Sequence, residues 1–92
     1  MNEKIKEIEN VLNGNMIVAL SKQCKKEIVI YTFYYNPNKE IITYQIKEHF
    51  ADKELNNPGK RKRKRVEIPV KEFLDAIVYD LLNRGYTLET YD

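Results

Sequence analysis

Apolar positions along the chain recur with the period of a helix in two places, one near each end. Between residues 5 and 12 they fall at spacings of three and four, and from 70 to 82 they follow the same spacing for longer. A single apolar stripe on an otherwise polar helix packs against one surface. The pattern predicts a helix over residues 2–12 that ends at Asn13-Gly14, and a longer one from Pro69 to Arg84.

The central part of the chain has the pattern of strands. Residues 28–35 are almost all β-branched or aromatic, which suits a pleated and half-buried surface. The turn-forming residues 36–39 follow, and 41–50 form the return strand of a hairpin. Before this hairpin, residues 16–20 indicate a short strand and residues 21–26 a polar turn.

The return strand is predicted to have one apolar and one wet face, because successive side chains of a strand lie on opposite faces. Strict alternation groups four residues on the apolar face: Ile42, Tyr44, Ile46 and Phe50. It groups four others on the wet face: Thr43, Gln45, Lys47 and His49. We expect the apolar group to lie under the helices.

The remaining segments complete an α+β fold. A cluster of turn residues at 56–59 leads into a basic stretch, so we predict a mobile basic loop at about 56–65. Residues 66–68 and 86–91 indicate two further short strands. The whole chain, 1–92, is predicted to be a single domain. The economical arrangement is an antiparallel sheet of three to five strands with two helices on one face, in the order α-β-β-β-β-α-β.

Positive charge is concentrated in one hexapeptide, although the net charge of the chain is only +2. This basic segment consists of Lys60, Arg61, Lys62, Arg63, Lys64 and Arg65. The fold does not require it, and six adjacent like charges repel one another until a polyanion neutralises them. We therefore predict that the basic segment contacts nucleic acid, either RNA or DNA, or a nucleoprotein complex.

Three other interpretations of the basic segment stay open. It is also suited to an acidic protein surface or to a nuclear-import signal. It is also compatible with a plain solvated loop, or with a loop that folds back on Glu72, Asp75 and Asp80 of its own C-terminal helix.

Seven tyrosines in 92 residues are the second unusual feature. Tyr31 and Tyr35 share one face of the central strand and Tyr34 lies on the other; together with Tyr44 they are candidates for stacking on bases or for a protein interface. An uncovered aromatic face is also compatible with a homodimer. Aromatic residues under the helices are expected to be core instead.

Groups for catalysis or metal binding are few. Cys24 and His49 are the only cysteine and the only histidine, and nothing in the sequence brings them together. We therefore expect a non-enzymatic protein without metal or cofactor. With a single cysteine, no long apolar run and a charged N-terminus, we also expect a cytoplasmic location and no membrane partner.

The first half of the chain resembles, in its layout, some small phage-encoded anti-CRISPR proteins. The likeness rests on a short helix (2–12), a strand (16–20) and a long hairpin (28–46), about half of the chain. It implies, as the alternative function, a stoichiometric protein inhibitor or adaptor of phage or mobile-element type. Such a protein would act through the aromatic face of the sheet, or through the acidic side of the C-terminal helix, which carries Glu72, Asp75, Tyr79 and Asp80. Because the basic segment differs from acidic DNA mimics, the resemblance favours guide RNA or an acidic protein as target.

Overall fold

The computed structural model describes residues 2–25, 27–50 and 58–89, with the backbone alone for residues 2, 44–47, 50 and 58–66. The chain runs through α1 (Asn2–Asn15), β1 (Ile17–Cys24), β2 (Glu27–Asn36), β3 (Ile41–Phe50) and β4 (Pro58–Pro69). One continuous helix follows, made of α2 (Val70–Glu72), the π-helical segment η1 (Phe73–Val78) and α3 (Tyr79–Asn83). The described part of the chain ends after β5 (Thr87–Leu88).

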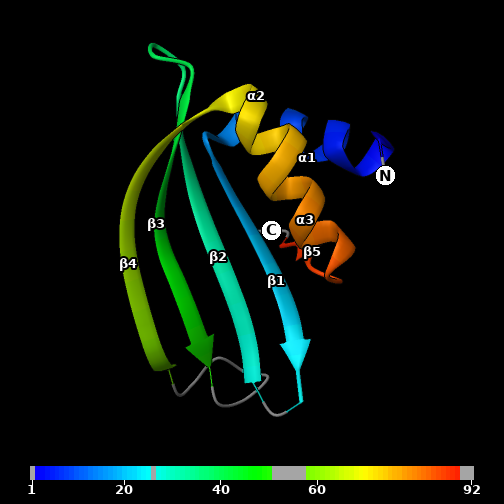
Figure 1. Cartoon of the computed structure of the whole chain (residues 1–92), viewed down its shortest axis with the longest axis vertical. Helices are drawn as coiled ribbons and strands as arrows, with labels where there is room; N and C mark the ends of the chain where they lie inside the picture. Colours follow the sequence, from blue (N-terminus) through cyan, green and yellow to red (C-terminus); the bar gives the residue numbers. More distant parts are fainter. Residues whose placement is uncertain (1, 26, 51–57, 90–92) are drawn as a thin grey trace.

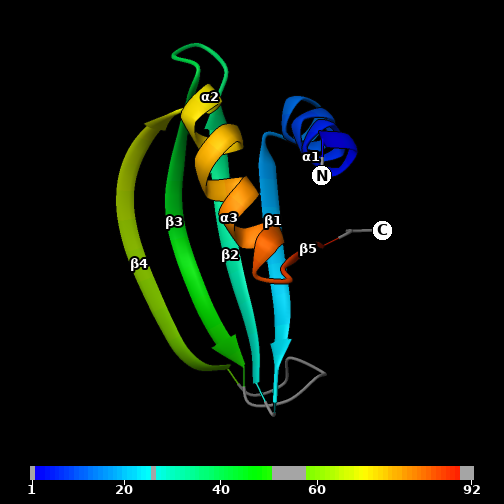
Figure 2. The same cartoon turned by 45° about the vertical axis from the view of Figure 1, so that its right-hand side comes forward.

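The strands form one antiparallel sheet in the order β4-β3-β2-β1-β5. Figures 1 and 2 show both helices on the same side of this sheet, which we call the helix face; the other side is the open face. This confirms the predicted α+β class, its order of elements and its two helices on one face. None of the described helices is long and apolar enough to span a bilayer.

The core lies between the helix face and the two helices. Phe33 of β2 packs on Phe73 of the long helix with ring centroids 4.7 Å apart. The other residues buried in this cluster come from both helices and from β1 and β3: Ile8, Leu12, Val18, Leu20, Ile42, Leu74, Val78 and Leu81. Six of these ten positions belong to the two helical stripes, so the helical periodicity correctly identifies the buried faces.

The first helix ends later than predicted. Asn13-Gly14 does not terminate it; the helix continues to Asn15, and Met16 takes the left-handed conformation with φ 60°. Two backbone hydrogen bonds hold Met16 there: its N–H donates to the Leu12 carbonyl at 2.8 Å, and its own carbonyl accepts from Tyr35 at 2.9 Å. Tertiary pairing with β2 therefore overrides the local preference of glycine for this position.

The strand β1 is longer than predicted, and β5 is shorter. The predicted polar turn over 21–26 is wrong up to Cys24, because β1 continues to that residue in register with β2. Ser21 is buried and its hydroxyl donates to the Glu89 carboxylate, while the Glu89 N–H donates to the Ala19 carbonyl at 2.9 Å. These contacts bring the C-terminal segment to the edge of β1. The closing strand described is Thr87–Leu88, and residues 90–91 of the prediction lie outside the described residues.

An extra residue in β3 changes its two faces. Phe33 pairs with Tyr44, but the preceding Thr32 pairs with Ile46, so Gln45 has no partner in β2. Such a bulge shifts the alternation of the strand by one position. Ile42 and Tyr44 share the helix face as predicted, but Ile46 and Phe50 fall on the open face with Thr43, whereas Lys47 and His49 fall on the helix face. The two predicted groups are therefore wrong beyond the bulge.

The basic segment is not a loop. Residues 60–65 lie within the twelve-residue strand β4, which pairs with β3 along its length and forms one edge of the sheet. Of the loop predicted at 56–65, residues 56–57 lie outside the described residues, and 58–65 are strand. The backbone hydrogen bonds of β3 are satisfied by β4, which outweighs the charge repulsion that favours an unpaired segment.

Candidate nucleic-acid interface

The basic segment lies along an edge of the sheet, with β3 as its neighbour. Its first four residues pair one to one: Lys60 with His49, Arg61 with Glu48, Lys62 with Lys47, and Arg63 with Ile46. The next ladder pair is Val66 with Tyr44, so Lys64 and Arg65 occupy an irregularity opposite Gln45. The structure thus places all six predicted basic residues on one continuous strand.

Strand geometry separates the lysines from the arginines. Lysine and arginine alternate in the basic segment, and paired residues of neighbouring strands share a face. Lys60 and Lys62 therefore occupy helix-face positions with His49 and Lys47, whereas Arg61 and Arg63 occupy open-face positions. A one-letter alternation in the sequence becomes a difference between two surfaces of the molecule.

The candidate tyrosines fall into two groups. Tyr31 and Tyr35 are half-buried on the helix face and pack against the core; the Tyr31 ring stacks on Phe33 at 6.3 Å and meets Tyr86 edge-on at 5.4 Å. Tyr34 is half-buried on the open face. For Tyr44 the structure describes the backbone alone, at a helix-face position opposite Phe33. Of the four, Tyr34 has the position best suited to contact a partner on the open face.

Tyr86 has the most perturbed ionisation among the described residues. Burial raises the pKa of its phenol to about 12, and Tyr31 contributes through its charge in the ionised form and through a side-chain hydrogen bond. A phenol with this pKa stays protonated at neutral pH. Through its ring contact with Tyr31, Tyr86 therefore holds the chain after the long helix against β2.

Cys24 and His49 do not form a catalytic pair. They lie on β1 and β3, with β2 between them, which separates the strands by about 10 Å. The His49 imidazole instead lies beside the Glu27 carboxylate, with 3.5 Å between Nδ1 and Oε2. Among the described residues, no group of three potential ligands is arranged to hold a metal ion.

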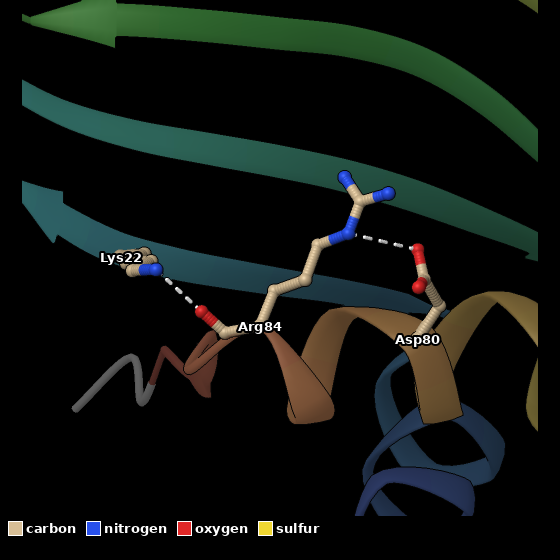
Figure 3. A network of polar contacts seen from close by, with 3 residues as sticks. All are labelled: Lys22, Asp80 and Arg84. Atoms are coloured by element: carbon tan, nitrogen blue, oxygen red, sulfur yellow. Dashed lines mark hydrogen bonds and ion pairs between the residues drawn. The ribbon is translucent and has the colours of Figure 1, made fainter.

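A second cationic group lies where the long helix ends. The Lys22 ammonium donates to the carbonyl oxygen of Arg84, and the Arg84 Nε lies 3.2 Å from an Asp80 oxygen (Figure 3). A cation at this point also interacts favourably with the negative end of the helix dipole. Lys22 pairs with Val29, and Val29 with His49, so these positions form one row across the helix face that continues to Lys60.

A pocket between α1 and the C-terminal part of the chain is small. It has a volume of about 170 Å³ and is lined by Lys4, Glu7, Ile8, Leu82, Thr87 and Leu88. Sites for drug-sized ligands usually have roughly 300–1,000 Å³. Its size and mixed lining do not indicate a substrate site.

Comparisons with known proteins leave the chain without a relative from which a function could be transferred. No protein-family model, no curated protein and no solved structure matches it. The function of the chain is therefore inferred from its own residues.

Lys47 and His49 are the residues at this interface that sequence reasoning missed. Alternation along the strand assigns them to a wet face, away from the helices, and gives no reason to connect them with the basic segment. Their position opposite Lys62 and Lys60 depends on the bulge at Gln45 and on the pairing of β3 with β4. An alternation of charge on both strands of a hairpin is the only sequence signal for such a pairing.

Proposed function

We propose that this protein is a non-enzymatic binding protein that contacts the phosphate backbone of nucleic acid, free or within a nucleoprotein, through the edge strand β4. The observation that carries the proposal is the pairing of the basic segment in a strand, which holds six cations along one edge of the sheet. Fixing the backbone that carries these residues before binding lowers the entropy cost of contacting a polyanion. Each phosphate that the protein neutralises also releases condensed counterions.

Binding of this kind has a measurable salt dependence. With six cations, the slope of log affinity against log salt is expected to be no steeper than about −5. The test is a salt titration with labelled single-stranded RNA, single-stranded DNA and duplex DNA. It compares the intact protein with a variant in which all six basic residues are replaced by threonine.

Threonine is the right replacement because it is neutral and favours strands, so β4 should persist without its charge. A circular dichroism melt of the variant checks that the sheet is intact. We expect the intact protein to bind with a steep salt slope and the variant to lose binding. If the folded variant binds as tightly as the intact protein, the basic segment is not the site.

The open face favours a second candidate function, a protein inhibitor or adaptor that acts through a protein interface. Ile28, Ile30 and Tyr34 lie half-buried on this face along β2, the middle strand of the sheet, and the figures show no helix on this side. Apolar groups gathered on an uncovered face are typical of interaction surfaces. A partner recovered from nuclease-treated lysate by the intact protein but not by Ile30→Glu would support this function; recovery by both would exclude the open face.

A further inference from the structure

The register of β3 and β4 places basic residues directly opposite one another on the helix face, and one of these pairs is lysine with lysine. Lys47 pairs with Lys62, and His49 pairs with Lys60. We call these four residues the basic patch. Positions directly opposite have Cβ atoms about 5 Å apart, and like charges at this separation destabilise the pair of strands. The fold therefore holds Lys47 and Lys62 together without gaining stability from their charges.

The open face of the same two strands has the opposite arrangement. Arg61 pairs with Glu48, an opposite charge, and Arg63 pairs with the apolar Ile46. An acidic residue directly across the ladder compensates Arg61 inside the protein. The helix face of β3 and β4 therefore carries Lys47, Lys60 and Lys62 with no acid directly across the ladder, whereas one of the two open-face arginines has an acid directly opposite.

The long helix does not pass over the part of the sheet where the basic patch lies. It begins near the end of β4 and crosses toward β1, so that in both views it passes away from the halves of β3 and β4 that carry the patch (Figures 1 and 2). The core residues contributed by β3 and β4, Ile42 and Ile68, lie at the opposite halves of these strands. The described side chain in the patch, His49, is 32% exposed.

We propose that the basic patch is the surface that contacts the phosphate backbone, on the helix face of the sheet and not along both faces of the edge. This inference rests on the proposed function and names the face, the residues and the kind of contact. Lys60 and Lys62 are two residues apart on a strand, which is about 6.6 Å. This spacing is comparable to that of successive phosphates along a nucleic-acid strand.

The chemistry of the patch makes binding independent of sequence. Lysine acts as a compact point charge and does not make the forked contact by which arginine recognises a guanine edge. Contacts to phosphates position a nucleic acid but carry no sequence information. The expected ligand is therefore the backbone itself, with similar affinity for unrelated sequences of one strand type.

Glu27 opposes anion binding at this surface. Its carboxylate is 59% exposed and lies 3.5 Å from His49, so a phosphate at His49 meets a negative charge. Removing that charge by Glu27→Gln should raise the affinity by about two- to five-fold, the size expected for one charge a few ångströms away in water. A decrease in affinity would count against the patch.

The alternation of lysine and arginine provides a matched pair of variants. Lys60→Thr with Lys62→Thr removes two cations from the helix face, and Arg61→Thr with Arg63→Thr removes two from the open face of the same strand. Removing one cation that touches a phosphate lowers affinity about eight-fold at 0.1 M salt, hence roughly 60-fold for two. We expect this decrease, and a salt slope shallower by about 1.8, for the lysine pair. For the arginine pair we expect a decrease below about three-fold.

The probes are two fluorescein-labelled oligonucleotides of unrelated sequence, and binding is measured by fluorescence anisotropy. Circular dichroism melts check that both double variants are folded. Equal decreases for the two pairs, or a larger decrease for the arginine pair, would overturn the assignment to the helix face. Loss of binding in the variant without any of the six cations would then still support the proposed function. Retention of binding in that variant would refute both.

Lys47→Thr tests the part of the patch that lies outside the basic segment. If the two strands bind together, this substitution lowers affinity about eight-fold, as for any cation that touches a phosphate. If the basic segment alone binds, the affinity stays within about two-fold, which would remove β3 from the site. Lys39→Thr, in the turn between β2 and β3, is the matched control and should bind as the intact protein does.

Discussion

Charge reversal at two adjacent positions of β4 should change stability in opposite directions. Lys62→Glu and Arg61→Glu make the same change in net charge, one residue apart. In the register of the sheet, however, position 62 lies opposite Lys47 and position 61 opposite Glu48. The first substitution therefore turns a repulsion into an attraction, and the second does the reverse.

The magnitude follows from the geometry of a cross-strand pair. Opposite or like charges directly across a ladder contribute roughly 0.2–1 kcal/mol, so reversing one sign changes the pair energy by about 1 kcal/mol. Both variants also relieve repulsion from neighbouring cations of the basic segment, which raises the stability of both. The difference between them is then about 2 kcal/mol, or roughly 8–16 °C in Tm for a domain of this size.

Thermal denaturation followed by circular dichroism, in low salt and in about 1 M salt, measures this difference. We expect Lys62→Glu to melt above Arg61→Glu in low salt and the gap to narrow in high salt, because salt screens exposed charges. Equal melting temperatures in low salt would mean that residues 60–65 do not pair with β3 in this register. The reverse order would mean that the register is shifted by one residue.

Three further predictions concern the fold. Met16→Gly should raise stability by about 1 kcal/mol in urea denaturation, because Met16 has a positive φ; Met16→Ala should not. Phe73→Ala should lower the free energy of unfolding by about 3–5 kcal/mol, because Phe73 is fully buried. Tyr79, on the same helix, is 48% exposed, so Tyr79→Ala should change the free energy of unfolding by less than about 0.5 kcal/mol. Similar losses for the two variants would contradict the described core. The pKa of Tyr86 in the folded state, raised to about 12, lies above the usual value of 10. The protonated phenol therefore contributes its full share to the folding stability below pH 10, and this share is lost as the pH rises toward 12. The advantage of the wild type over Tyr86→Phe should therefore shrink over this range, and a constant difference would refute the assignment.

The elements with strong periodicity could be predicted from the sequence, because their local and tertiary preferences agree. Seven apolar residues between Val70 and Leu82 recur at helical spacing, with at least one on every turn. Those that are buried belong to the core. The hairpin is equally determined, since turn residues separate two β-rich runs. The Asn36 side chain accepts a hydrogen bond from the Asn38 N–H at 3.0 Å, as turn chemistry requires.

The basic segment could not be predicted in the same way, because its local preference opposes its structure. Six like charges favour an extended, solvated chain, and no apolar alternation marks residues 60–65 as a strand. The unpaired edge of β3, ten residues long, supplies the reason for pairing, and this edge exists only once the sheet has formed. The candidate site could not be predicted for the same reason. Lys47 and His49 of β3 belong to it only because β3 pairs with β4 in the observed register.

The bulge at Gln45 determines which surface of the molecule carries charge. If Gln45 instead paired regularly with Thr32, without a bulge, strict alternation would hold along β3 and the faces of residues 46–50 would be exchanged. Ile46 and Phe50 would then join the side that carries the helices, and Lys47 and His49 would move to the opposite side. A slip of one residue in the pairing of β3 with β2 would thus transfer a cationic surface from one side of the protein to the other, without any change in the sequence.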